Sequence, residues 1–203
     1  MSSNLQPSLT ERRKAATQLD IARAAAELFA DRGPDGTTAE EIAQRAGIAL
    51  RTFYRYFRNK EDAVSPLLSA GGAYWRALLA AEPPGTDLRE ALAHAARMSL
   101  TPTDAAGAEA LEGTRGLLRA AARDAALRAV WYRVNQESEE QLTPVLAGLA
   151  DRGELELKMI AACATDAIRL SLEAWATTSA PADGPEGPAA LADACMRRLL
   201  QWL

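Results

Sequence analysis

The chain has 203 residues, of which 48% are hydrophobic and 25% charged, and its formal net charge is −4. It contains no run of eighteen apolar residues and its first residues lack the apolar stretch of a signal peptide, so we expect a cytoplasmic protein without a membrane partner. Cys163 and Cys195 are far apart and lack the paired spacing of a zinc site. We therefore expect two reduced thiols, no metal and no cofactor.

Two helix starts near the N-terminus carry the Ser/Thr-x-x-Glu spacing, in which side chain and backbone satisfy each other's hydrogen bonds. Ser8 and Glu11 predict a first helix over residues 9–31, and Thr38 and Glu41 predict a short second helix that begins at Thr38. A Gly-Pro-Asp-Gly turn at residues 33–36 separates the two helices.

Gly47 ends the second helix, because glycine occupies the left-handed region without a Cβ penalty, and a third helix begins almost at once. Steps of 100° divide this helix into two arcs. We expect the side chains of one arc to pack against the other helices, and those of the opposite arc to point outward, where they can enter a groove. The packing arc holds Leu50, Phe53, Tyr54 and Phe57, and the opposite arc holds Arg51, Thr52, Arg55 and Tyr56.

The third helix and the residues after it form a segment rich in cations. No acidic residue lies between Ala49 and Lys60, and the tyrosine and threonine hydroxyls there are groups that bond phosphate oxygens. A solvated surface helix is the alternative, but such faces usually alternate acidic with basic residues. The pattern favours a DNA-reading helix pair.

The negative charge lies mainly in the second part of the chain. Residues 1–62 contain ten Lys or Arg and nine Asp or Glu, whereas residues 63–203 contain thirteen and eighteen. The local potential over the third helix, and not the total charge, governs attraction to phosphate. We therefore predict a DNA-binding domain at residues 1–62 and a larger domain at residues 63–203.

The larger domain shows only helical patterns. We expect helices at residues 87–100, 104–122, 123–150 and 154–178 and a last helix from Pro188, and no segment has the alternation of a strand. Pro66 either kinks a helix near residues 62–66 or opens a separate helix at Ser65. The predicted fold is all-α, with an N-terminal three-helix bundle containing a helix-turn-helix, a larger helical domain and about nine helices in total.

The last two predicted helices are broadly apolar and need a covering partner. The simplest partner is the same helix pair from a second copy, which gives a homodimer with a four-helix bundle. Two copies also present two recognition helices to successive major grooves, which favours a palindromic site.

The other helices of the larger domain are candidates to enclose a small molecule. Aromatic and polar residues near their inward stripes are the mixture expected in a mostly apolar pocket, although large side chains at helical spacing more often form core. The candidate ligand-binding residues are Trp75, His94, Met98, Trp131, Tyr132, Asn135 and Trp175.

The segment from Ala22 to Val64 resembles the N-terminal domain of tetracycline-repressor (TetR) family transcription regulators. The resemblance is carried by Gly36-Thr37-Thr38, by Ala46-Gly47 and above all by the run from Thr52 to Phe57 followed by Asn59-Lys60-Glu61. It implies a DNA-binding head, a helical effector-binding body, a homodimer and repression relieved by a small-molecule effector.

The resemblance also implies roles for single residues. It suggests phosphate contacts for Thr38, Tyr54, Tyr56 and Lys60, and a base-reading side made of Arg51, Thr52 and Arg55. Ala49 departs from the family pattern, which commonly has a serine there that caps the recognition helix. Loss of such a cap costs about 1 kcal/mol.

Two other classes of protein compete with this interpretation. An enzyme is disfavoured because the chain has a single histidine, no Gly-rich phosphate loop and no nucleophile elbow. A helical ligand-binding or adaptor protein that does not read DNA is the second alternative. The intact cationic segment from Arg51 to Lys60 argues against that alternative.

Overall fold

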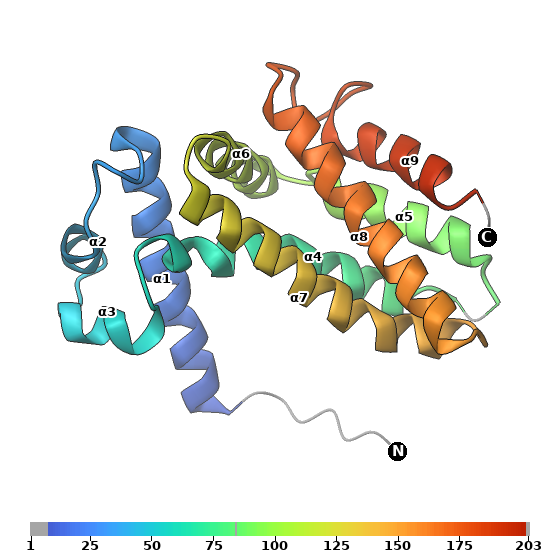
Figure 1. Cartoon of the computed structure of the whole chain (residues 1–203), viewed down its shortest axis with the longest axis horizontal. Helices are drawn as coiled ribbons and strands as arrows, with labels where there is room; N and C mark the ends of the chain where they lie inside the picture. Colours follow the sequence, from blue (N-terminus) through green and yellow to red (C-terminus); the bar gives the residue numbers. More distant parts are fainter. Residues whose placement is uncertain (1–7, 84, 202–203) are drawn as a thin grey trace. The chain divides into compact units, whose positions relative to one another are not determined.

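The computed structural model describes residues 8–83 and 85–201, and every regular element in those ranges is helical (Figure 1). Nine α-helices and one 3-10 helix occur there, which confirms the predicted all-α fold. The chain forms two compact units that divide between Leu67 and Leu68, whereas the predicted boundary falls after residue 62. Every helix within the described ranges is too short or too polar to span a lipid bilayer.

The N-terminal unit contains three α-helices and a 3-10 helix whose starts follow local sequence signals. Both predicted capping boxes are present, at Ser8 with Glu11 and at Thr38 with Glu41. Hydrogen bonds from the Thr38 backbone N–H and from Arg32 lower the pKa of the Glu41 carboxyl. The elements are α1 (Leu9–Arg32), α2 (Ala39–Arg45), α3 (Leu50–Tyr56) and η1 (Glu61–Val64).

A small apolar core holds these helices together. Helix α1 contacts α2 and η1, and α2 contacts α3. Fully buried residues come from all four elements, so the seven-residue α2 and α3 are stabilised by packing that neither would have alone. These residues include Ile21, Ala25, Ile42, Phe53, Ala63 and Val64.

The turn between α2 and α3 depends on Gly47. Its φ is 68°, in the left-handed region, and its N–H donates to the Gln44 carbonyl at 3.1 Å. The next N–H, of Ile48, donates to the Ala43 carbonyl at 2.9 Å. These bonds satisfy carbonyls at the end of α2 and allow α3 to begin three residues after Gly47, as expected for a helix-turn-helix.

The C-terminal unit is built around α8, which packs against α9, α7 and α6, while α5 packs against α9 (Figure 1). Its buried core runs from Trp75 and Leu79 to Leu142, Ile160 and Met196. Its helices are α4 (Ser65–Ala80), α5 (Leu88–Leu100), α6 (Ala105–Ala121), α7 (Ala125–Leu149), α8 (Glu154–Ala176) and α9 (Pro188–Leu199). The first residues of α4 belong to the N-terminal unit.

Pro66 lies in the first turn of α4, directly after η1. A proline at this position removes an N–H that has no helical acceptor in any case, so it does not break the helix. Of the two alternatives left open by the sequence, the structure has the helix that begins at Ser65.

We predict that Phe53→Ala destabilises the N-terminal unit by about 3 kcal/mol or more, because Phe53 is fully buried and its loss leaves a cavity. The matched control is Tyr54→Ala, which removes an exposed ring from the same helix and is expected to cost under about 1 kcal/mol. Amide hydrogen exchange in α1 measures the stability of this unit separately from the other. Equal losses for the two variants would contradict the burial of Phe53 and the exposure of Tyr54.

Candidate DNA interface and ligand cavity

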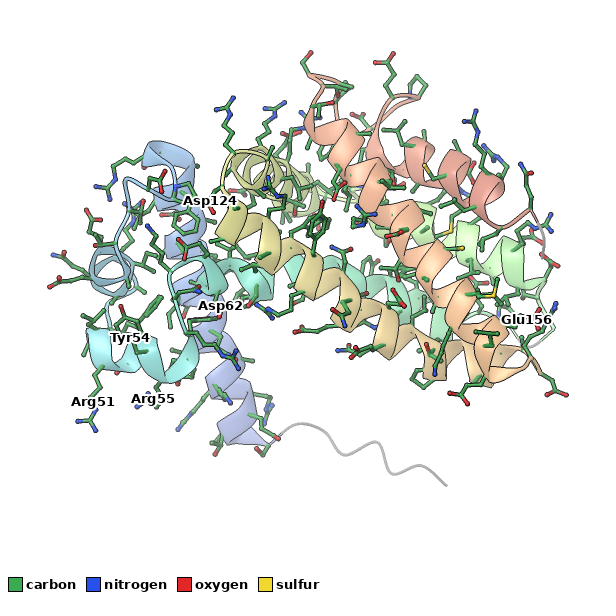
Figure 2. All side chains as sticks on the ribbon, viewed as in Figure 1. Arg51, Tyr54, Arg55, Asp62, Asp124 and Glu156 are labelled. Carbon is green, nitrogen blue, oxygen red and sulfur yellow. The ribbon has the colours of Figure 1, made fainter. Side chains whose placement is uncertain are left out.

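Helix α3 presents a cationic surface. Arg51 and Arg55 are exposed, Thr52 and Tyr56 are half-buried, and Figure 2 shows Arg51 projecting from α3 away from the rest of its unit. Neither arginine forms an ion pair with a described residue, and the Arg55 guanidinium lies 5.1 Å from the centre of the Tyr56 ring. In the predicted outward arc, Arg51 and Arg55 are therefore exposed, whereas Thr52 and Tyr56 are only partly exposed.

The predicted packing arc of α3 is only partly correct. Phe53 and Phe57 are buried, with ring centres 5.7 Å apart, but Tyr54 is 56% exposed and Leu50 is 37% exposed. The Tyr54 ring meets Phe53 edge to face at 5.4 Å, and the rest of it faces solvent. Tyr54 lies 100° around the helix from the buried Phe53, so it joins the accessible face, where its hydroxyl is available to a partner.

Thr38 is exposed at the start of α2, where its hydroxyl belongs to the capping box. The hydroxyl accepts from the Glu41 N–H at 3.2 Å and donates to the Glu41 carboxylate at 3.1 Å. A hydroxyl oxygen has two acceptor positions and can rotate its proton. A phosphate contact by Thr38 therefore requires that its proton turn away from Glu41.

Lys60 holds the turn between α1 and α2. Its ammonium donates to the carbonyls of Pro34 at 2.7 Å and Thr37 at 3.0 Å, and the Glu61 carboxylate lies 3.7 Å away. The Thr37 side chain is buried, and its hydroxyl lies 3.0 Å from the Gly33 carbonyl and 3.3 Å from that of Leu28. Lys60 thus already binds the protein's own backbone, and its phosphate contact stays a prediction.

Helix α3 lacks a side-chain cap. Ala49 occupies the N-cap position with extended backbone angles, φ −71° and ψ 147°, and offers no side-chain acceptor to the first turn. The backbone geometry is the one in which Ser or Thr normally caps a helix. The cap is therefore missing because alanine has no side-chain acceptor, and not because the backbone has the wrong conformation.

A cavity of about 440 Å³ lies between α6, α7 and α8 in the C-terminal unit. Two of the predicted ligand residues, Trp131 and Tyr132, are in its wall. The cavity is lined by apolar side chains together with three arginines and one carboxylate: Leu118, Arg119, Ala121, Ala122, Arg123, Arg128, Trp131, Tyr132, Glu173, Ala176 and Thr177.

The other five candidates lie outside this wall. Trp75 belongs to the apolar core, and Trp175 is fully buried with the Arg115 guanidinium 3.7 Å from its ring centre. His94 is exposed, with Nδ1 2.6 Å from the Glu82 carboxylate. Met98 is exposed, and the Asn135 amide donates to the Trp131 carbonyl at 2.8 Å.

The arginines of the cavity were not among the residues proposed from the sequence. A signal for them exists in composition: residues 113–136 contain five arginines and a single acidic residue, Asp124. Asp124 caps α7 by accepting from the Leu127 N–H at 2.7 Å, so its charge is engaged at the helix start. An arginine-rich stretch with so few acids is unusual for a solvated helix pair.

Comparison with known proteins agrees with the geometry of the N-terminal unit. Residues 21–64 match the family described as bacterial regulatory proteins, tetR family. The chain is 30% identical over 143 residues to the HTH-type transcriptional regulator TcmR of Streptomyces glaucescens, which covers 70% of this chain and 63% of TcmR. It is 34% identical over 88 residues to the HTH-type transcriptional repressor Rv3405c of Mycobacterium tuberculosis, covering 41% of this chain and 47% of that one.

Solved structures resemble the chain over most of its length. FadR of Thermus thermophilus, a TetR family repressor solved with lauroyl-CoA, has a TM-score of 0.54 and 27% identity, covering 90% of this chain and 93% of FadR. The multidrug binding protein EbrR, solved with imidazole, has a TM-score of 0.54 and 25% identity with the same coverage. The chain thus covers nearly the full length of these two structures, whereas it spans less than two thirds of the length of the curated relatives.

We predict that Ala49→Thr stabilises the N-terminal unit by about 1 kcal/mol, because a hydroxyl at this N-cap accepts from a first-turn N–H of α3. Ala49→Val is the isosteric control and is expected to give no such gain, since it adds the same bulk without an acceptor. Hydrogen exchange of the α3 amides measures the difference. A gain shared by both variants would show that bulk at this position, and not capping, is what α3 lacks.

Proposed function

We infer that this protein, a member of the tetR family of bacterial regulatory proteins, is a homodimeric transcriptional regulator that binds a palindromic operator and is released by a small-molecule effector. One observation carries the inference: an accessible cationic face on α3, held from behind by buried Phe53 and Phe57. Residues 1–62 act as the DNA-binding domain, and residues 63–203 bind effector and dimerise. The protein acts in the cytoplasm, without catalysis.

The roles on DNA follow from the chemistry of each side chain. Arg51, Thr52 and Arg55 face the bases, since arginine forms bidentate hydrogen bonds with guanine in the major groove. Hydroxyls and an ammonium suit the phosphate backbone. The proposed phosphate contacts are Thr38, Tyr54, Tyr56 and Lys60.

Dimerisation is supported by one face of α8. Leu155, Met159 and Leu170 are 74%, 48% and 42% exposed, and their positions fall within 60° of one another at 100° per residue. Large apolar side chains exposed on one stripe mark a surface that a partner covers. We propose that α8 and α9 of a second copy cover it, which makes the interface self-complementary and the operator two-fold symmetric.

An effector site is supported by the cavity between α6, α7 and α8, whose volume is typical of small-molecule sites. FadR was solved with lauroyl-CoA and EbrR with imidazole, so related folds hold ligands of different size. Repression is the outcome suggested by Rv3405c and FadR, both of which are named repressors. An effector releases DNA only if it binds the DNA-free conformation more tightly.

Selection of bound sequences from random duplex DNA tests the proposed function. The expected product is a palindromic motif with half-sites about one helical turn apart. Recovery of no motif, together with binding that depends only on salt, would leave the alternative of a ligand-binding or adaptor protein that does not read sequence.

We predict that Arg55→Glu lowers operator affinity by about tenfold to a hundredfold, because it removes one contact and places a carboxylate against the DNA. Arg133→Glu, which makes the same charge reversal at an exposed site on α7 in the C-terminal unit, is the control and is expected to leave affinity within about twofold. Fluorescence anisotropy at several salt concentrations measures both variants. Equal effects would mean that net charge alone, and not the α3 face, governs binding.

We predict that Met159→Glu combined with Leu170→Glu converts the dimer to a monomer, because two carboxylates would be buried against an apolar partner. Tyr74→Glu is the control, since it places the same charge on another exposed large side chain, on α4. Sedimentation velocity gives the mass of each species. A dimer that survives the double substitution would exclude this face of α8 from the interface.

A further inference from the structure

We propose that the cavity between α6, α7 and α8 binds a small organic anion with a planar apolar body, and that the anion takes Arg119 away from backbone carbonyls at the end of α8. The proposal rests on the proposed function only where it calls this ligand the effector. The binding itself follows from the charges and contacts of the cavity wall.

The wall carries a surplus of positive charge. Arg119, Arg123 and Arg128 line the cavity, and Glu173 is the one carboxylate in its lining. That carboxylate is already occupied, because it accepts from the Trp131 indole N–H at 2.7 Å and from the Arg169 guanidinium at 3.1 Å. Glu173 therefore neutralises Arg169 and leaves the three lining arginines without an acidic partner among the described residues.

Two of these arginines have donors available to a ligand. Arg123 is exposed, and its guanidinium forms no hydrogen bond or ion pair with a described residue. Arg128 makes only long contacts, 3.5 and 3.4 Å, with the carbonyls of Ala121 and Ala122. A guanidinium has five N–H donors in a planar fork that matches a carboxylate, sulfonate or phosphate. The pair is therefore suited to one anionic group at the end of α6 and the start of α7.

The rest of the wall suits an apolar body. Leu118, Ala121 and Ala176 are buried aliphatic residues, and Trp131 is buried with its indole N–H fixed by Glu173. A fixed aromatic side chain offers a stacking surface at little cost in conformational entropy. The volume of about 440 Å³ fits a molecule of two or three fused or linked rings and is too small for a peptide segment.

Arg119 connects the cavity to the packing of the unit. Its Nε donates to the Ala176 carbonyl at 2.7 Å and its Nη2 to the Thr178 carbonyl at 2.5 Å. Arg115, one turn earlier on α6, donates to the Ala180 carbonyl and stacks on Trp175. These two arginines join α6 to the C-terminal end of α8, where carbonyl groups lack helical donors.

An anion in the cavity competes with the Ala176 and Thr178 carbonyls for the hydrogen bonds of Arg119. An anion attracts a guanidinium as an opposite charge and can accept two parallel hydrogen bonds from it, whereas a backbone carbonyl carries no net charge. Arg119 is exposed and borders the cavity, so its side chain reaches an anion by rotation, whereas Arg115 is buried and stays in place. Occupation of the cavity thus replaces two of the bonds between α6 and α8 and biases the unit toward a second arrangement.

The test uses two fluorescent probes that differ in one charge. Anilinonaphthalene sulfonate carries an anionic group on a planar apolar body, and phenylnaphthylamine has the same ring skeleton without the sulfonate. Each is titrated into the full-length protein without DNA. We expect saturable binding of the sulfonate at one site per chain, with affinity at least about tenfold above that of the neutral probe.

Single substitutions locate the site. Arg123→Met and Arg128→Met keep apolar bulk and remove the charge, and each is expected to weaken binding of the sulfonate by about tenfold while changing that of the neutral probe by less than about twofold. Arg133→Met, on the same helix as Arg128 but outside the cavity lining, is the control and is expected to change neither. Helical circular dichroism and thermal unfolding of each variant establish that it is folded.

Three results would overturn the proposal: equal affinity for the two probes, sulfonate binding that is unchanged in both arginine variants, or an equal loss in Arg133→Met. A parallel measurement of operator binding separates this question from the proposed function. Operator binding without selective sulfonate binding would remove only the anion site. Selective sulfonate binding without operator binding would keep the site and remove the proposed function.

Discussion

The N-terminal unit depends on the burial of one side of a helix that is too short to be stable alone. Helix α3 has seven residues and no side-chain cap, and isolated helices of that length are not populated in water. Phe53, fully buried, and Phe57, nearly so, attach it to the bundle and fix its rotation about its own axis. Because one side is fixed, the opposite side with Arg51 and Arg55 has a defined direction, which a DNA-reading surface requires.

Much of this arrangement was predictable because its determinants are local. Capping boxes at Ser8 and Thr38 and the left-handed Gly47 act within a few residues of chain, and the positions of α1, α2 and α3 follow from them. The exposure of Tyr54 and the bonds of Lys60 were not predictable in the same way. They depend on how much room the core offers and on where a turn 23 residues away presents its carbonyls, and neither is encoded in periodicity.

The residues of the ligand cavity were harder to predict from the sequence. Of the aromatic residues predicted to bind ligand, Trp131 and Tyr132 line the cavity, but Trp75 and Trp175 fill core positions, as large side chains at helical spacing usually do. The charged part of the wall comes from α6, α7 and α8 and from the connection between α6 and α7. Arg119 and Glu173 are far apart in sequence and meet only because α6 packs on α8, which no pattern within either helix reveals.

The division of α3 into a packed and an accessible side has a consequence for the divergence of such proteins. Phe53 supports the fold from within the core, whereas Arg51 and Arg55 are exposed on the opposite side of the helix. Substitutions at the outward positions therefore leave thermodynamic stability nearly unchanged. A duplicated gene has the freedom to acquire a new target sequence by a few replacements on this surface, while its descendants keep the same scaffold.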